Sequence, residues 1–159
     1  MLFGSGETIA STVYGTVVAM ATLAVAFATQ KSPLKLAAIV GSTALVLWIA
    51  HVYAHSLSQR IALERPLRRA DLRPIARREL GILLAAVLPC AALTVGALES
   101  VSDVTAVWLA MGVGLATLEA EAIRYARLEH LGPRRTAVAL VLNLALGCLV
   151  VLLKIGVSH

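Results

Sequence analysis

Two histidines four residues apart are the most informative chemical feature of this sequence. His51 and His55 stand in the segment HVYAH, inside an uncharged apolar stretch. If the stretch is helical, the two imidazoles lie about 40° apart around the axis and one turn apart along it. Such a pair can chelate a divalent metal, relay protons near neutral pH, or form hydrogen bonds between helices. The sequence leaves these three roles open.

Glu119 is the second candidate, because it is a carboxylate within another apolar stretch. Ionisable groups within a membrane-spanning segment are energetically costly, so their presence suggests a function by default. Glu121, two residues further on, points to nearly the opposite side of a helix, and we expect it to pair with Arg124. Glu119 is therefore the predicted functional carboxylate. Together with His51 and His55, it would complete a metal-ligand set of two histidines and one glutamate.

The apolar stretches that must position these residues indicate a membrane protein. The chain of 159 residues is 59% hydrophobic and 14% charged, against about 45–50% and about 25% in soluble domains. Spanning a hydrocarbon core takes roughly 20 residues of helix. Five stretches fit: residues 9–29, 36–57, 80–98, 104–123 and 136–153. They predict an all-α integral membrane protein, a bundle of five transmembrane helices. We expect one domain over residues 1–159, in the inner (plasma) membrane.

The connections between these stretches carry residues that begin or end helices. Pro33 follows Ser32, Ser102–Asp103 can cap the fourth span, and Gly132–Pro133 separates the fourth span from the fifth. Pro74 suits the first turn of a helix that runs directly into the span at 80–98. The connection at residues 58–79 is the longest, and we expect it to be a basic cytoplasmic loop.

Small residues four apart predict close packing of the helices. The pairs are Gly15–Ala19, Ala37–Gly41, Ala110–Gly114 and Gly112–Ala116. Such spacing lets two helix backbones approach each other, within one chain or between copies.

The cations predict the orientation of the chain. All eleven arginines lie in residues 58–79 or 124–135, whereas the lysines Lys31, Lys35 and Lys154 lie at the other ends of the spans. Arginine and lysine are enriched in cytoplasmic connections, so we predict a cytoplasmic N-terminus and an outside C-terminus. The net charge of +5 is then an orientation signal. The longest basic connection has no aromatic residue for base stacking, so we expect no nucleic-acid partner.

Several polar side chains fall at a similar depth in the predicted spans. Counted at about 1.5 Å per residue from the charged residues that flank the spans on the cytoplasmic side, they lie roughly 7–14 Å from the cytoplasmic edge: His51, His55, Glu119, Tyr14 and Asn143. This layer predicts the ion or proton pathway of a channel or transporter. Five short helices enclose little space, so we expect a homo-oligomer.

Enzymatic activity is the less favoured interpretation. The sequence contains no Walker loop, G-x-S-x-G or H-E-x-x-H motif, and we assign no catalytic residue and no cofactor. A membrane-embedded metalloenzyme that uses His51, His55 and Glu119 is the remaining enzymatic alternative.

A further alternative is a non-catalytic membrane component that binds anionic lipids or partner helices. Its predicted lipid-binding residues are Arg68, Arg69, Arg73, Arg77 and Arg78, which are interspersed with apolar residues. Arginines near an anionic leaflet contribute on the order of 1 kcal/mol each. The simpler interpretation is that these arginines only orient the chain.

Overall fold

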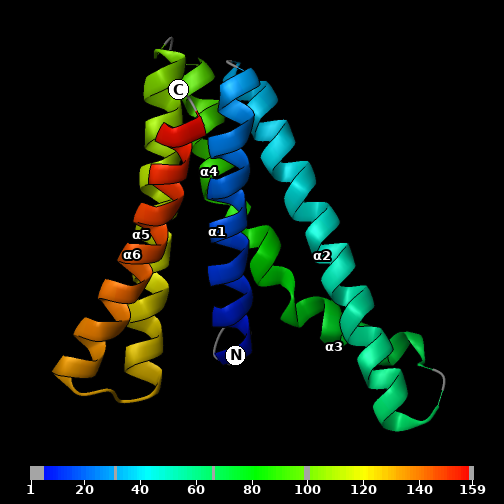
Figure 1. Cartoon of the computed structure of the whole chain (residues 1–159). Helices are drawn as coiled ribbons and strands as arrows, with labels where there is room; N and C mark the ends of the chain where they lie inside the picture. Colours follow the sequence, from blue (N-terminus) through cyan, green and yellow to red (C-terminus); the bar gives the residue numbers. More distant parts are fainter. Residues whose placement is uncertain (1–5, 31, 66, 99–100, 158–159) are drawn as a thin grey trace.

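The computed structural model describes residues 6–30, 32–65, 67–98 and 101–157, which form six helices and no strand. The helices are α1 (Gly6–Thr29), α2 (Pro33–Leu63), α3 (Arg69–Arg78), α4 (Leu80–Leu98), α5 (Asp103–Leu128) and α6 (Pro133–Val157). All except α3 are long and apolar enough to cross a membrane. The five apolar stretches of the sequence therefore correspond to five long helices (Figure 1).

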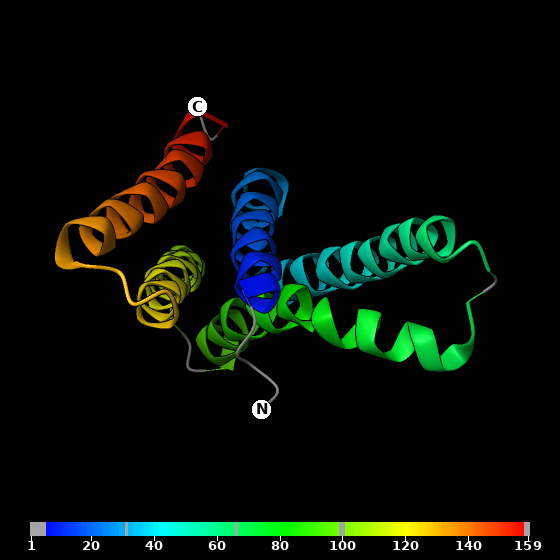
Figure 2. The ribbon, with the colours of Figure 1, turned by 90° about the horizontal axis from the view of Figure 1, so that it is seen from below.

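The helices spread apart toward one end of the molecule, which we call the Arg-rich end. It holds the α2–α3 and α5–α6 connections and the start of α1, whereas α6 ends at the opposite end (Figure 1). Seen from the Arg-rich end, α5 and α6 lie on one side of α1, and α2 and α3 on the other (Figure 2). Lys35 stands in the first turn of α2, at the opposite end, and Lys31 lies outside the described residues. The side of the membrane that each end faces stays a prediction.

A continuous apolar core joins α1, α2, α4, α5 and α6. Its most completely buried large side chains are Met20, Leu23, Leu36, Val40, Leu93, Met111 and Leu118. Within a bilayer, where lipid is as apolar as these side chains, helices associate mainly through van der Waals packing. The fit between neighbouring helices therefore decides how they cross.

The closest approach between helices is the crossing of α1 and α4. A Cβ atom at Gly15 would lie 2.7 Å from the Ile82 Cα and 3.1 Å from the Ala85 Cβ. On the other side of the contact, a Cβ at Gly81 would collide with the Ser11 and Thr12 hydroxyls. Only glycine fits at either position, since the backbones leave no room for a side chain. The predicted packing role of Gly15 is thus confirmed, and Gly81 is its counterpart.

The face of α1 that meets α4 carries buried hydroxyls rather than apolar groups alone: Thr8, Ser11, Thr12 and Thr16. Thr12 donates to the Thr8 carbonyl at 2.9 Å, and Thr16 donates to the Thr12 carbonyl at 2.8 Å. Bonds to the carbonyl one turn earlier satisfy the hydroxyl without a partner on another helix. These small side chains allow the close crossing without leaving an unpaired donor in apolar surroundings.

The predicted basic loop at residues 58–79 is largely helical. α2 continues to Leu63, and α3 begins at Arg69 rather than near Pro74, so Pro74 lies inside a helix instead of in its first turn. Nor does this helix run directly into the next span, because the chain turns at Glu79 before α4. The physical reason is that α3 is rich in arginine whereas α4 is uncharged and largely apolar, so the two segments suit different surroundings.

The start of α3 is fixed by Asp71. Its Oδ2 accepts from the Arg68 backbone N–H at 2.8 Å and from Arg65 Nη1 at 2.9 Å. The Arg65 guanidinium, followed by the Arg68 N–H, holds the pKa of this carboxyl below its usual range. The stabilisation is therefore present above the ordinary pKa of aspartate, and it is lost as the pH falls through the lowered value.

The other expected helix starts are confirmed. Ser102 precedes α5, and its Oγ accepts from the Thr105 N–H at 3.2 Å. Pro33 and Pro133 are the first residues of α2 and α6, where the missing N–H of proline costs nothing. The helices also extend past the apolar stretches at the Arg-rich end, with α2 reaching Leu63 and α5 reaching Leu128.

We expect Gly15→Leu to destabilise the fold through the α1–α4 crossing. Overpacking a close helix contact costs about 1–3 kcal/mol, which the free energy of unfolding in mixed detergent micelles would measure. Gly112→Leu is the matched control, since a Cβ at Gly112 meets nothing within 4 Å. Equal losses in the two variants would contradict the importance of this contact.

Candidate functional site

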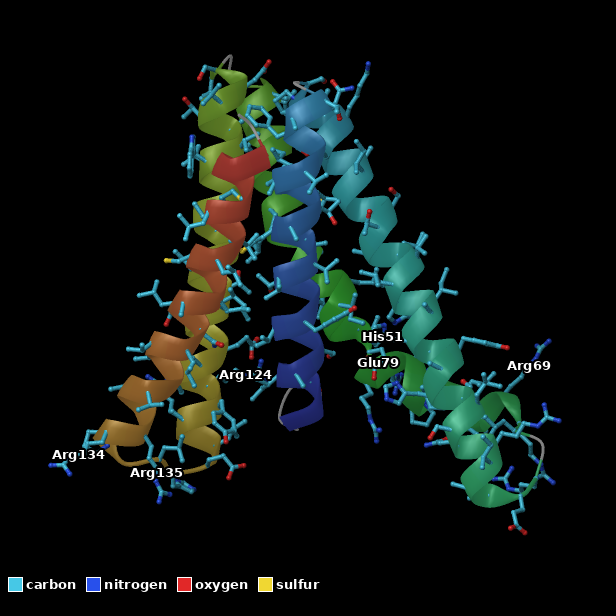
Figure 3. All side chains as sticks on the ribbon, viewed as in Figure 1. His51, Arg69, Glu79, Arg124, Arg134 and Arg135 are labelled. Atoms are coloured by element: carbon cyan, nitrogen blue, oxygen red, sulfur yellow. The ribbon has the colours of Figure 1, made fainter. Side chains whose placement is uncertain are left out.

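A polar hollow lies where α1, α2 and the turn between α3 and α4 meet. Its volume is about 270 Å³, and it is open at the protein surface. The residues that line it are Ala10, Ser11, Tyr14, His51, His55, Arg78 and Glu79. Three of the five predicted pathway residues, namely Tyr14, His51 and His55, are thus brought together. Figure 3 shows His51 and Glu79 between α2 and the α3–α4 turn.

Glu79 is the buried charge of this hollow. Its side chain is only 6% exposed, and its Oε1 lies 3.2 Å from the Nδ1 of His55, whose side chain is 47% exposed. A carboxylate in apolar surroundings requires an opposite charge or hydrogen-bond donors. His55 brings its Nδ1 within 3.2 Å of the carboxylate and, when protonated, supplies the opposite charge. The pair therefore joins a buried carboxylate to an imidazole that is half exposed at the protein surface.

His51 lies one turn from His55 along α2 and contacts α1. Its ring lies 5.0 Å from the Tyr14 ring, between centroids, in a tilted arrangement. Its Nδ1 is 3.0 Å from the Leu47 carbonyl, which can only accept, so the hydrogen bond places a proton on Nδ1. When His51 is neutral, its Nε2 is then the nitrogen free to accept a proton.

Side chains of α1 and α2 hold the end of α3 in place beside the hollow. Trp48 donates from Nε1 to the Ala76 carbonyl at 3.1 Å. The Ser11 Oγ lies 3.2 Å from the Arg78 carbonyl and 3.1 Å from the Thr8 carbonyl, and it can donate to either. The last carbonyls of a helix lack partners within it. Here neighbouring helices offer donors to them, which fixes the position of the turn at Glu79.

The remaining predicted pathway residues, Glu119 and Asn143, do not line this hollow. Asn143 donates from Nδ2 to the Leu118 carbonyl at 2.9 Å, so it joins α6 to α5. Glu119 stands on α5, and its Oε1 is buried without a hydrogen-bond partner. The predicted layer is therefore divided into two groups, because depth along a helix does not determine which way a residue faces.

The Glu121–Arg124 pair forms as predicted. Arg124 Nη1 lies 3.0 Å from Glu121 Oε1 and 3.1 Å from Oε2. Figure 3 shows Arg124 on the other side of α1 from His51 and Glu79. This pair is consequently separate from the polar hollow.

The predicted metal ligands are not assembled. Among the residues that the structure describes, no three His, Cys, Asp or Glu side chains are grouped to hold a metal ion. His51 and His55 belong to the hollow, but Glu119 does not. Glu79 occupies the position by His55 that the sequence prediction gave to Glu119.

Glu79 is the functional candidate that sequence reasoning missed. It was counted within the basic connection, as the last residue before the apolar stretch at 80–98. The available signal was its position, since it is the one carboxylate of residues 58–79 that directly adjoins an apolar stretch. Its burial depends on the turn before α4 and on the close approach of α1, which no local pattern shows.

Comparisons of the chain with protein-family models, with curated proteins and with solved structures give no match. The assignment of a function therefore depends on the geometry of the site.

We expect Ser11→Ala to loosen the end of α3. Loss of one hydrogen bond costs about 1 kcal/mol. This corresponds to an about fivefold faster amide exchange at the end of α3, which hydrogen–deuterium exchange of the peptide covering residues 69–79 would detect. Ser42→Ala is the control, because the exposed Ser42 hydroxyl bonds only within its own helix, to the Ile39 carbonyl at 3.0 Å. Unchanged exchange in the Ser11 variant would show that the serine bonds the Thr8 carbonyl instead.

Proposed function

We propose that this chain is an ion or proton channel or transporter whose proton-binding site is the polar hollow. The observation that carries the proposal is the contact between buried Glu79 and half-exposed His55, at 3.2 Å, beside His51 and Tyr14. All of these residues stand on or next to helices that are long and apolar enough to cross a membrane.

The His55–Glu79 pair has the chemistry of a proton-binding site. The imidazole of His55 can bind a second proton, and it lines a hollow that is open at the protein surface. Once protonated, His55 faces a carboxylate that has little other solvation, so proton uptake turns a neutral–anionic contact into an ion pair. Intramembrane ionisable groups of this kind mark ion and proton pathways in many membrane proteins.

His51 and Tyr14 extend the site beyond His55. His51 is nearer than His55 to the middle of α2, and its ring contacts Tyr14 on α1. The free Nε2 of His51 is a proton acceptor when Nδ1 bonds the Leu47 carbonyl. We therefore propose that a proton passes from solvent to His55, which is paired with Glu79, and from there to His51.

Beyond the hollow, buried apolar side chains fill the core of the described part of the chain. The core that follows toward the opposite end includes Met20, Leu23, Leu36 and Val40, each at most 1% exposed. Close-packed apolar side chains exclude water and ions. We extend the proposal to a homo-oligomer in which the second half of the path lies between copies.

We expect Glu79→Gln to reduce pH-driven flux in proteoliposomes by at least about tenfold. Glutamine keeps the size of the side chain but removes its charge, so the Nδ1 of His55 loses the carboxylate oxygen that lies 3.2 Å away, and about 1.4 kcal/mol of lost stabilisation gives that factor. Flux would be followed with a pH-sensitive dye inside the vesicles.

Glu129→Gln provides the control for this experiment, because Glu129 is an exposed carboxylate that follows α5 at the Arg-rich end. It should leave flux unchanged. Wild-type flux in both Glu79→Gln and His51→Ala vesicles would remove the hollow from the mechanism.

The oligomer has a separate test. Native mass spectrometry from nanodiscs should release multiples of the 16.7 kDa chain. A single chain at every protein-to-lipid ratio, with flux intact, would show that the path is contained in one copy.

A further inference from the structure

α3 is a short amphipathic helix that lies across the Arg-rich end. One side faces the rest of the protein, where Ile75 is buried and the Ala76 carbonyl accepts from Trp48. Seen from the Arg-rich end, α3 and the adjoining part of α2 project outward together, away from α1, α5 and α6 (Figure 2). None of the other helices that the structure describes covers the outer surface of this pair (Figure 2).

The arginines of the predicted lipid-binding set have different surroundings. Arg78 lines the polar hollow, and Arg68 precedes α3 with its backbone N–H bonded to Asp71. The other three are Arg69, Arg73 and Arg77, which are exposed and spaced four residues apart. At this spacing they form one row along the helix, with about 40° between successive members.

The row has no acidic counterpart in the described part of the chain. The ion pairs found there join Arg65 to Asp71, Arg124 to Glu121, and His55 to Glu79. None of them includes Arg69, Arg73 or Arg77. Three adjacent cations without carboxylates are matched by a partner with several negative charges.

Large apolar side chains are exposed on α3 and at the end of α2 that precedes it. Ile61 is 78% exposed at the end of α2, Leu63 is 48% exposed, and Leu72 on α3 is 38% exposed. A solvated loop gains nothing by exposing large apolar groups next to arginines. A helix in the headgroup region of a bilayer is stabilised by this arrangement, because the apolar groups enter the acyl layer while the arginines reach lipid phosphates.

We propose that α3 lies in the membrane interface and that Arg69, Arg73 and Arg77 bind the phosphates of anionic phospholipids. Arginine suits this role since its guanidinium can donate two parallel hydrogen bonds to one phosphate. The site is distinct from the polar hollow, and its occupation does not depend on whether the protein conducts ions.

The test is retention of anionic lipid. The purified wild-type chain, in micelles with equal amounts of phosphatidylglycerol and phosphatidylcholine, should retain phosphatidylglycerol preferentially in native mass spectrometry. The R69Q/R73Q/R77Q variant should lose this preference by about tenfold or more. Each arginine near an anionic surface strengthens binding to that surface roughly fivefold.

Two further variants make the result specific. R127Q/R134Q/R135Q removes three exposed arginines from the α5–α6 end, and thus the same charge, and it should keep the preference; Figure 3 shows Arg134 and Arg135 at the far side of the molecule from Arg69. R69K/R73K/R77K should keep an intermediate preference, because lysine retains the charge without the paired donors.

Three results would overturn the proposal. One is a wild type without preference for the anionic lipid, and another is an equal loss in the two glutamine variants, which would indicate unspecific charge attraction. The third is an unchanged preference in R69Q/R73Q/R77Q. A circular dichroism spectrum like that of the wild type would show that loss of lipid is not loss of the fold. If R69Q/R73Q/R77Q does not fold, the lysine variant decides: a lipid preference equal to that of the wild type overturns the bidentate arginine site.

Discussion

The contact on which the rest of the structure depends is the crossing of α1 and α4 at Gly15 and Gly81. Neither position has room for a Cβ, so the two backbones meet directly. This approach brings Ser11 within hydrogen-bond distance of the Arg78 carbonyl, at the end of α3. A pair of glycines thus determines where α3 ends and where the chain turns before α4.

The turn between α3 and α4 creates the polar hollow. Glu79 is the residue between an arginine-rich helix and an apolar one, and its side chain is directed into the protein rather than into solvent. His55 on α2 makes this burial tolerable, because its Nδ1 lies 3.2 Å from the carboxylate and supplies the opposite charge when it is protonated. The same local charge balance that allows the turn also supplies the proton chemistry of the proposed function.

The two sides of α1 have different polar groups and, on our proposals, different roles. On one side lie Tyr14, His51 and the His55–Glu79 pair, with the exposed arginine row of α3 nearby. On the other, Arg124 is paired with Glu121 within α5, while Asn143 joins α6 to α5. Proton binding and lipid binding are therefore proposed for the α2–α3–α4 part. For the α5–α6 part we propose mainly a role in helix packing.

The sequence by itself determined the helical character, the five long apolar helices and several of their ends, since length, hydropathy and helix-starting residues act locally along the chain. It also identified Tyr14, His51 and His55, and the Glu121–Arg124 pair. It could not decide that Glu79, and not Glu119, is the carboxylate beside the histidines. That choice depends on how each helix is rotated and on how closely α1 approaches α4, which arise from packing between segments far apart in the sequence. The depth of a residue follows from its position along one helix. The direction in which its side chain points depends on the packing of all the helices, so only the tertiary structure could bring these side chains together.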